Sequence, residues 1–111
     1  MAGSATAGEG TFLRVLPASD LPEGKGRAVT VAGEEVLLVR SGGRIHAVQN
    51  LCTHQRAKLE GGRVRHGHIS CPLHGMLFDL ATGAPKGSLS RIPLKVYPVR
   101  VVDDWIEVQV G

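Results

Sequence analysis

The sequence predicts an all-β protein built from small antiparallel sheets, and three observations lead to this fold class. The chain has 111 residues, which is short enough for one compact domain. Its apolar residues come in runs of strand length, bounded by Gly, Pro, Ser and Asp. Gly 15 and Pro 6 supply many turns, and no segment sustains the 3.6-residue period of a helix.

The first residues predict a tail outside the fold. Residues 1–10 are small and polar and have no periodicity that could bury a face, so we expect them to be disordered and the domain to span 11–111. No apolar run reaches the roughly 20 residues that cross a bilayer, and the opening lacks the basic and apolar parts of a secretion signal. We therefore expect a cytoplasmic protein that has no membrane contact.

A β-meander is predicted for the first half of the domain. Its strands are expected over Thr11–Leu16, Arg27–Val31, Glu35–Arg40 and Arg44–Gln49. Gly42-Gly43 stands where a two-residue hairpin turn needs positive φ, and Ala32-Gly33 has the same position one strand earlier. Two hairpins in series make the meander.

Four further strands are predicted toward the C-terminus. They are expected over His68–Cys71, Met76–Leu80, Leu94–Val102 and Trp105–Val110, with Asp103-Asp104 joining the last two. In the final run Ile106 and Val108 alternate with Trp105 and Glu107, which predicts one buried and one solvated face. Helical structure is limited to at most one turn, near 57–59.

Residues 50–90 form a Gly-rich insertion between the two groups of strands. This insertion holds both cysteines and four of the five histidines. A β domain that spends so much chain on loops usually uses them for function.

Two short motifs in the insertion indicate a metal centre. They are Cys52-Thr53-His54 and Cys71-Pro72-Leu73-His74, separated by 16 residues. Thiolates suit iron or zinc, and imidazole is a common ligand beside them. The spacing within the first pair is wrong for one helix face, so each pair is expected on a loop. A Cys–His hydrolase has no local support, because such an enzyme needs a base aimed at the thiolate and an oxyanion site.

These motifs, followed by Gly75, Phe78-Asp79 and Thr82-Gly83, resemble the Rieske iron–sulfur domain, and in particular the small Rieske ferredoxins of aromatic-ring dioxygenases. The resemblance covers roughly Phe12–Val110. It implies the Rieske fold, with three small antiparallel sheets and a cluster-binding loop subdomain at one tip. It also implies one 2Fe-2S cluster, with Cys52 and Cys71 on one iron and His54 and His74 on the other.

The resemblance further implies a soluble one-electron carrier rather than an enzyme. Its partners would be a flavin-dependent ferredoxin reductase and the Rieske centre of a terminal oxygenase. The chain has no Gly-x-Gly-x-x-Gly fingerprint and no further 2-His-1-carboxylate set. The alternatives are the small Rieske-like subunit of a nitrite reductase, a ferredoxin of a monooxygenase, and a Cys2His2 zinc module of structural role.

Four positions predict a low reduction potential within this family. The quinol-oxidising branch has two further cysteines, at positions matching Ala57 and Leu73, and hydroxyl donors at positions matching Met76 and Phe78. Without those donors the reduced cluster is less stabilised. We expect a potential near the low end of the family's span of about −150 to +300 mV.

The net charge of +3 is concentrated in the middle of the chain. The basic residues lack interleaved aromatic side chains, so nucleic-acid binding is not expected. The resemblance implies that Arg56, Lys58 and Lys86 flank the two histidines. We expect them to meet acidic patches on the redox partners.

Overall fold

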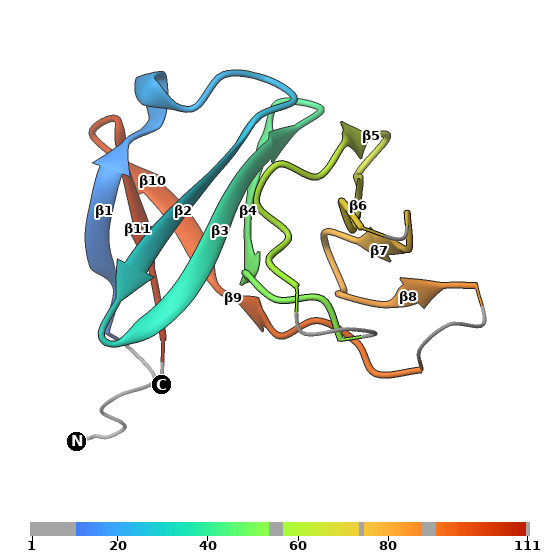
Figure 1. The fold of residues 1–111 in the computed structure, drawn as a ribbon. Helices are drawn as coiled ribbons and strands as arrows, with labels where there is room; N and C mark the ends of the chain where they lie inside the picture. The colour runs from blue at the N-terminus through green and yellow to red at the C-terminus, as the bar shows by residue number, and fades with distance from the viewer. Residues whose placement is uncertain (1–10, 54–56, 74, 88–90, 111) are drawn as a thin grey trace.

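The computed structural model describes residues 11–53, 57–73, 75–87 and 91–110, and Figure 1 shows their arrangement. The elements are β1 (Leu13–Pro17), η2 (Ala18–Asp20), β2 (Gly26–Val31), β3 (Glu34–Ser41), β4 (Arg44–Gln49), β5 (Val64–Arg65), β6 (His68–Ser70), β7 (Leu77–Asp79), β8 (Pro85–Lys86), β9 (Val96–Tyr97), β10 (Val99–Val102) and β11 (Trp105–Val108). Within these ranges the one helix is the short turn η2, and no helix there has the length and apolar character to cross a membrane.

The strands form three antiparallel sheets, which confirms the predicted fold class. One sheet has the order β1-β11-β10, the central sheet has the order β2-β3-β4-β9, and the third has the order β5-β6-β7-β8. We call the third the cluster sheet, because it lies within the insertion that carries both cysteine motifs. In Figure 1 the cluster sheet lies at the end of the molecule opposite β1 and β11.

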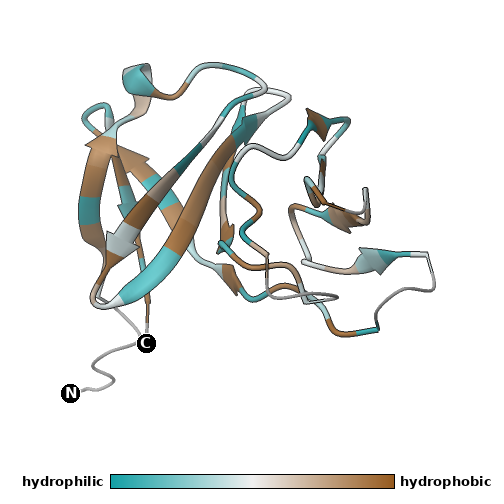
Figure 2. Ribbon diagram, in the orientation of Figure 1, coloured by the Kyte–Doolittle hydropathy of each residue, from teal (hydrophilic) through white to brown (hydrophobic). Residues whose placement is uncertain are grey.

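The central sheet is buried on both of its faces. Val36, Leu37, Leu38 and Val39 of β3 are each 0% exposed, so this strand has a continuous apolar run instead of an alternating one. Figure 2 shows the same pattern, with a hydrophobic middle and hydrophilic ends along β3. The alternating side chains of β3 therefore reach two different cores.

The first of these cores lies between the central sheet and the cluster sheet. Its buried members are Leu37, Val39, Val48, Cys52, Leu59, Ile69, Cys71, Met76, Phe78, Leu80 and Leu94. The second core lies between the central sheet and β1-β11-β10. Its buried members are Leu16, Ala18, Leu21, Val31, Val36, Leu38, Ala47, Tyr97, Ile106 and Val108. Both cysteines belong to the first core.

The predicted hairpin turn at Gly42-Gly43 is confirmed. These residues have φ of 61° and 79°, and the flanking Ser41 and Arg44 pair across the hairpin. Positive φ at both central residues gives the turn a twist that matches the strands, and glycine adopts it without a steric cost. The carboxylate of Glu23 accepts both glycine N–H groups, at 2.6 and 2.9 Å, and these bonds lower its pKa.

The single strand predicted over Leu94–Val102 is wrong, because Pro98 divides it in two. β9 pairs with β4 of the central sheet, through Tyr97 and Ala47, whereas β10 pairs with β11 in another sheet. Proline has no N–H for a strand ladder and its φ is fixed. The chain therefore changes sheets at this residue.

Two short strands of the cluster sheet were not expected. β5 joins β6 through a turn at His66-Gly67, with φ of 52° and 75°. β8, at Pro85 and Lys86, forms because β7 supplies a pairing partner from elsewhere in the chain. Residues 57–59 are not helical.

The outer face of β11 is also less solvated than predicted. The side chain of Glu107 is only 10% exposed, and Arg14 and Arg100 pair with it at 3.5 and 2.7 Å from the two flanking strands. The guanidinium groups of these arginines lie over the rings of Trp105 and Phe12. Cross-strand pairing thus covers the carboxylate of Glu107, which the alternating pattern predicts to be exposed to solvent.

The predicted disordered tail, residues 1–10, lies outside the described residues. The domain limits of 11–111 and the cluster-binding insertion of 50–90 therefore stay predictions.

Candidate metal centre

The first cysteine loop follows β4 and is closed by hydrogen bonds. The Cys52 N–H donates to the carbonyl oxygen of Ala57 at 2.7 Å. The Asn50 side-chain oxygen accepts the N–H groups of Leu59 and Glu60 at 3.1 and 2.9 Å. Thr53 Oγ1 also donates to the Ile92 carbonyl at 2.6 Å, which ties the loop to the segment before β9. The loop is held from both sides.

The second cysteine loop is the connection between β6 and β7. The Cys71 N–H donates to the Met76 carbonyl at 2.8 Å, and the Gly75 N–H donates back to the Cys71 carbonyl at 2.9 Å. The two loops therefore share one closure, in which the cysteine N–H bonds to the carbonyl five residues later. In sequence each loop contains one of the predicted histidine ligands.

Both thiols are buried and free. Cys52 and Cys71 are each 1% exposed, form no disulfide and belong to the same core. The structure thus brings two of the four predicted ligands into one buried cluster. His54 and His74, and also Arg56, lie outside the described residues, so their predicted roles are neither confirmed nor contradicted.

The residues present fit an iron–sulfur centre. Two buried free thiols lie in one core, and each comes from a loop closed by the same type of backbone hydrogen bond. Thiolate is the usual ligand of iron–sulfur clusters. Imidazoles inside the same loops would complete a mixed sulfur and nitrogen set. Buried apolar side chains share the core with both thiols.

The core beside the cysteines contains no hydroxyl at the two positions singled out in the sequence. Met76 is 3% exposed and Phe78 is 0% exposed, and both pack in the same core as the cysteines. Ala57 packs at the edge of that core, whereas Leu73 is 66% exposed. Neither of the latter positions offers a thiol for a bridging disulfide.

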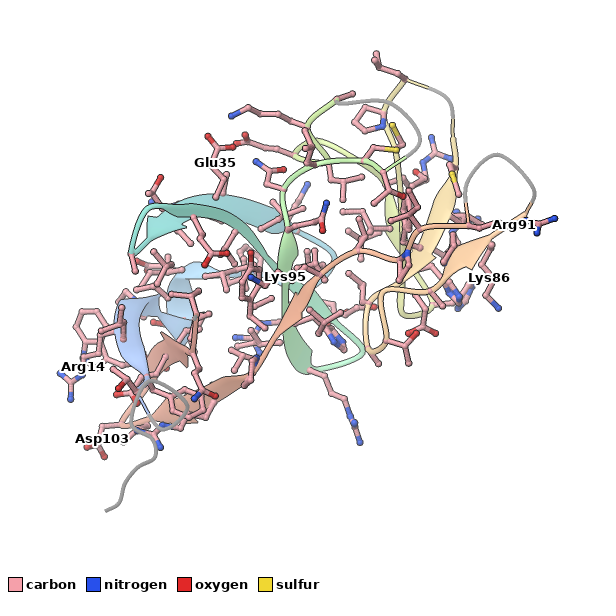
Figure 3. All side chains as sticks on the ribbon, turned by 90° about the horizontal axis from the view of Figure 1, so that it is seen from below. Arg14, Glu35, Lys86, Arg91, Lys95 and Asp103 are labelled. Carbon is pink, nitrogen blue, oxygen red and sulfur yellow. The ribbon has the colours of Figure 1, made fainter. Side chains whose placement is uncertain are left out.

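The predicted basic flank is only partly as expected. Lys58 forms an ion pair with Glu35, with Nζ 2.7 Å from Oε1, so its charge is compensated on the surface. Lys86 is exposed and has no ion pair with a described residue. Figure 3 shows Lys86 and Arg91 at the end of the molecule opposite Arg14 and Asp103.

Exposed apolar side chains lie beside both loops. Leu73 is in the second loop, and Ile92, which is 62% exposed, is in the segment bonded to the first. Leu77, on β7, is 43% exposed.

A small all-β scaffold that buries a cysteine pair in two matching loops defines a class: proteins that carry an iron–sulfur centre at one end of a β fold. Residues 11–98 match the family described as the Rieske 2Fe-2S domain. This chain belongs to the Rieske 2Fe-2S family, and its cofactor is one Rieske-type 2Fe-2S cluster.

Sequence relatives indicate which branch of the family this chain resembles, the ferredoxins of aromatic dioxygenase systems. The chain is 45% identical, over 85 residues, to the ferredoxin subunit of anthranilate 1,2-dioxygenase from Burkholderia cepacia. This match covers 76% of the chain and 79% of the relative. Relatives of this kind are electron-transfer components and not enzymes in their own right.

Solved structures with a similar fold include two from carbazole dioxygenase systems and one nitrite reductase subunit. The ferredoxin of carbazole 1,9a-dioxygenase from Nocardioides aromaticivorans IC177 superposes with a TM-score of 0.86 at 37% identity, covering 91% of this chain and 99% of that one. A chain from a complex of reduced oxygenase and oxidised ferredoxin in carbazole 1,9a-dioxygenase gives 0.80 at 35% identity, covering 86% and 99%. A putative nitrite reductase small subunit from Mycobacterium tuberculosis gives 0.81 at 26% identity, covering 91% and 96%.

Proposed function

We propose that this chain is the electron carrier of an aromatic-ring dioxygenase system. In this role it accepts one electron at a time from a flavin-dependent reductase and delivers it to the Rieske centre of a terminal oxygenase. The observation that carries the proposal is the buried pair of free cysteines in two matching loops, in a chain whose relatives are dioxygenase ferredoxins. The reductase is inferred because the sequence has no dinucleotide fingerprint of its own.

We propose that Cys52 and Cys71 hold one iron of the cluster and that His54 and His74 hold the other. The bound cluster supplies one-electron redox chemistry. The chain holds the two sulfur ligands in a buried apolar core, and the backbone hydrogen bonds of the two loops fix their positions. The apolar side chains around them provide no hydroxyl to stabilise added negative charge, which supports a low reduction potential.

The ligand assignment is tested by one substitution made at three histidines. His54→Asn and His74→Asn should each abolish the Rieske absorption and its electron paramagnetic resonance signal, because each removes a ligand to iron. His66→Asn is the control, since His66 is exposed and Asn tolerates its φ of 52°. An unaltered spectrum in the His54 or His74 variant would contradict the assignment. Zinc instead of iron in freshly purified protein would favour the structural zinc module.

The pathway is tested by electron delivery. The reduced chain should be reoxidised rapidly by the oxygenase component of the anthranilate 1,2-dioxygenase system, measured by stopped-flow absorption. The nitrite reductase alternative predicts transfer to a nitrite reductase large subunit instead. Dioxygenase ferredoxins are favoured because their identity to this chain is higher, at 45% and 37% compared with 26%.

A cytoplasmic location stays part of the proposal. Fractionation of cells that express the tagged chain should recover it with cytoplasmic markers. Recovery with the membrane or periplasmic fraction would contradict it.

A further inference from the structure

The outward face of the cluster sheet has a regular side-chain pattern. Ile69 and Phe78 pair across β6 and β7 and are buried, so their neighbours Ser70 and Leu77, which also pair, point outward. Lys86 on β8 pairs directly with Leu77. At the opposite edge the Ser70 N–H bonds to the Arg63 carbonyl. One row of outward residues thus crosses the sheet, which we call the outer row: Arg63, Ser70, Leu77 and Lys86.

The cations of this face are uncompensated within the described chain. Arg63, Arg65 and Lys86 are exposed, and none forms an ion pair with a described residue. Elsewhere in the described chain, four positive side chains pair with carboxylates: Arg14, Lys58, Lys95 and Arg100. The outer face of the cluster sheet therefore presents free positive charge.

The Asp79 carboxylate on this face already accepts hydrogen bonds from its own turn. Asp79 Oδ1 accepts the N–H groups of Ala81 and Thr82 at 2.8 and 3.0 Å, and Oδ2 lies 4.0 Å from His68 Nε2. The backbone bonds lower the pKa of Asp79, the bond from Thr82 most strongly. Asp79 is thus committed to its own turn, and it forms no ion pair with the arginines or the lysine of the face.

A groove joins this face to the candidate centre. It has a volume of about 600 Å³, and its lining includes Arg63, Arg65, Ser70, Leu77 and Cys71. Because the buried Cys71 contributes to the wall, a protein seated in the groove would stand directly against a residue that we assign to the cluster. Leu77 provides an apolar centre between the charged edges.

We propose that the outer face of the cluster sheet docks the terminal oxygenase, through an acidic surface of the oxygenase with an apolar contact at its centre. The proposal rests on the proposed function, since it names the partner surface for that electron carrier. Arg63, Arg65 and Lys86 would steer the carboxylates of the partner, and Leu77 would be the desolvated contact.

An acidic protein suits this face better than a nucleic acid does. Single-stranded nucleic acid is usually held by basic residues combined with aromatic side chains on which bases stack. The outer row has an aliphatic leucine at its centre, and the aromatic Phe78 points inward. Charge with an aliphatic centre is typical of a protein contact.

The charge of the face is tested with small redox probes. Reduced holoprotein is oxidised by ferricyanide, an anion, or by tris(phenanthroline)cobalt(III), a cation, over a range of salt concentrations. Arg65→Glu should slow the ferricyanide reaction about fivefold at low salt and speed the cobalt reaction, because two units of charge change in the groove that Cys71 also lines. Arg27→Glu makes the same charge change at an exposed side chain on β2 and is the control, with an expected change under about twofold.

The docking role is tested with the oxygenase component of the anthranilate system. Arg65→Glu and Lys86→Glu should lower the second-order rate of electron delivery and flatten its salt dependence. Leu77→Ser should lower this rate at every salt concentration, whereas Val102→Ser, at an exposed apolar position on β10, should not. The cluster spectrum of each variant checks that the centre is intact.

Three outcomes would overturn the inference. The first is an equal effect of Arg65→Glu and Arg27→Glu on the probes. The second is normal delivery to the oxygenase by both Leu77→Ser and Lys86→Glu. The third is tight, salt-sensitive binding to single-stranded DNA with no effect of these variants on delivery. If instead the wild-type carrier gives a Rieske spectrum but never reduces the oxygenase, the proposed function fails, and the ferricyanide comparison still reports on the face.

Discussion

The central sheet and the cluster sheet share one core but are stabilised in different ways. β3 runs for eight residues, and its middle is buried on both faces. The strands of the cluster sheet have two or three residues each, too few to form a stable sheet alone. The cluster sheet therefore depends on the core behind it and, we infer, on the metal cluster bound in its loops.

The two regions also differ in whether their basic side chains form ion pairs. In the β1-β11-β10 sheet, Arg14 and Arg100 are paired with one nearly buried glutamate. In the cluster sheet, Arg63, Arg65 and Lys86 have no such partner among the described residues. Ion pairs within a scaffold surface compensate its charges, whereas unpaired charges on a contact surface can attract an oppositely charged partner.

Removal of the metal cluster should produce the largest difference between the two regions, measured as the protection of their backbone amides against hydrogen exchange. Loss of iron leaves the Cys52 and Cys71 loops without their shared ligand, so amide exchange in β6 and β7 should accelerate about a hundredfold or more. The amides of β3 should keep most of their protection. Hydrogen-exchange mass spectrometry of the holo and chelator-treated protein measures both, and an equal loss in the two regions would contradict the comparison.

The junction between the two regions is tested at Gly83. This residue has φ of 79°, and a Cβ added there would lie 2.2 Å from the Leu94 carbonyl oxygen. Gly83→Ala should therefore cost about 3 kcal/mol of unfolding free energy or more. Gly33→Ala has a similar φ of 84° but open space, so it should cost about 1 kcal/mol. Thermal unfolding of the two variants checks this, and equal costs would show that only backbone strain matters.

The apolar wall of the cysteine core is tested by adding hydroxyl groups. Met76→Ser and Phe78→Tyr should each raise the reduction potential, because a donor to sulfur stabilises the added negative charge. A hydrogen bond worth about 1.4 kcal/mol corresponds to about 60 mV for one electron. Protein-film voltammetry measures the shift, and Ile106→Val in the other core is the control. A potential that does not rise would mean that neither side chain reaches the cluster sulfur.

The smallest effect is expected at His46 on β4, between the two regions. Burial lowers its pKa most, nearby Arg44 lowers it further, and Asp79 opposes them. The unfolded chain therefore binds the proton more readily, near pH 6.5, so stability should fall as the pH drops through that value and level off below the folded pKa. Since the side chain of His46 is only partly buried, the change should stay under about 1 kcal/mol. Unfolding curves of the wild type and His46→Gln at pH 5 and pH 8 compare the slopes.

Local features of the chain were predictable because they depend on neighbouring residues. The Gly42-Gly43 hairpin follows from backbone freedom, and the metal motif follows from ligand types and spacing. The strand break at Pro98 had a visible signal in the missing N–H, which the apolar run around it concealed. The His66-Gly67 pair likewise marked the turn between β5 and β6.

Other features had no local signal. The burial of Glu107 depends on two arginines from strands on either side, and β8 forms because β7 lies beside it. Arg63 and Lys86 are far apart in sequence, and only the register of the cluster sheet places them in one row with Leu77.

By itself the sequence determined the β class, most of the turns and the chemistry of the proposed ligands, since backbone preferences and side-chain donors belong to single residues and their neighbours. The tertiary structure alone decided which strands share a sheet, which core receives both cysteines and which charges stay unpaired. Those outcomes depend on long-range pairing, where the gain from burying surface and satisfying hydrogen bonds outweighs local preference.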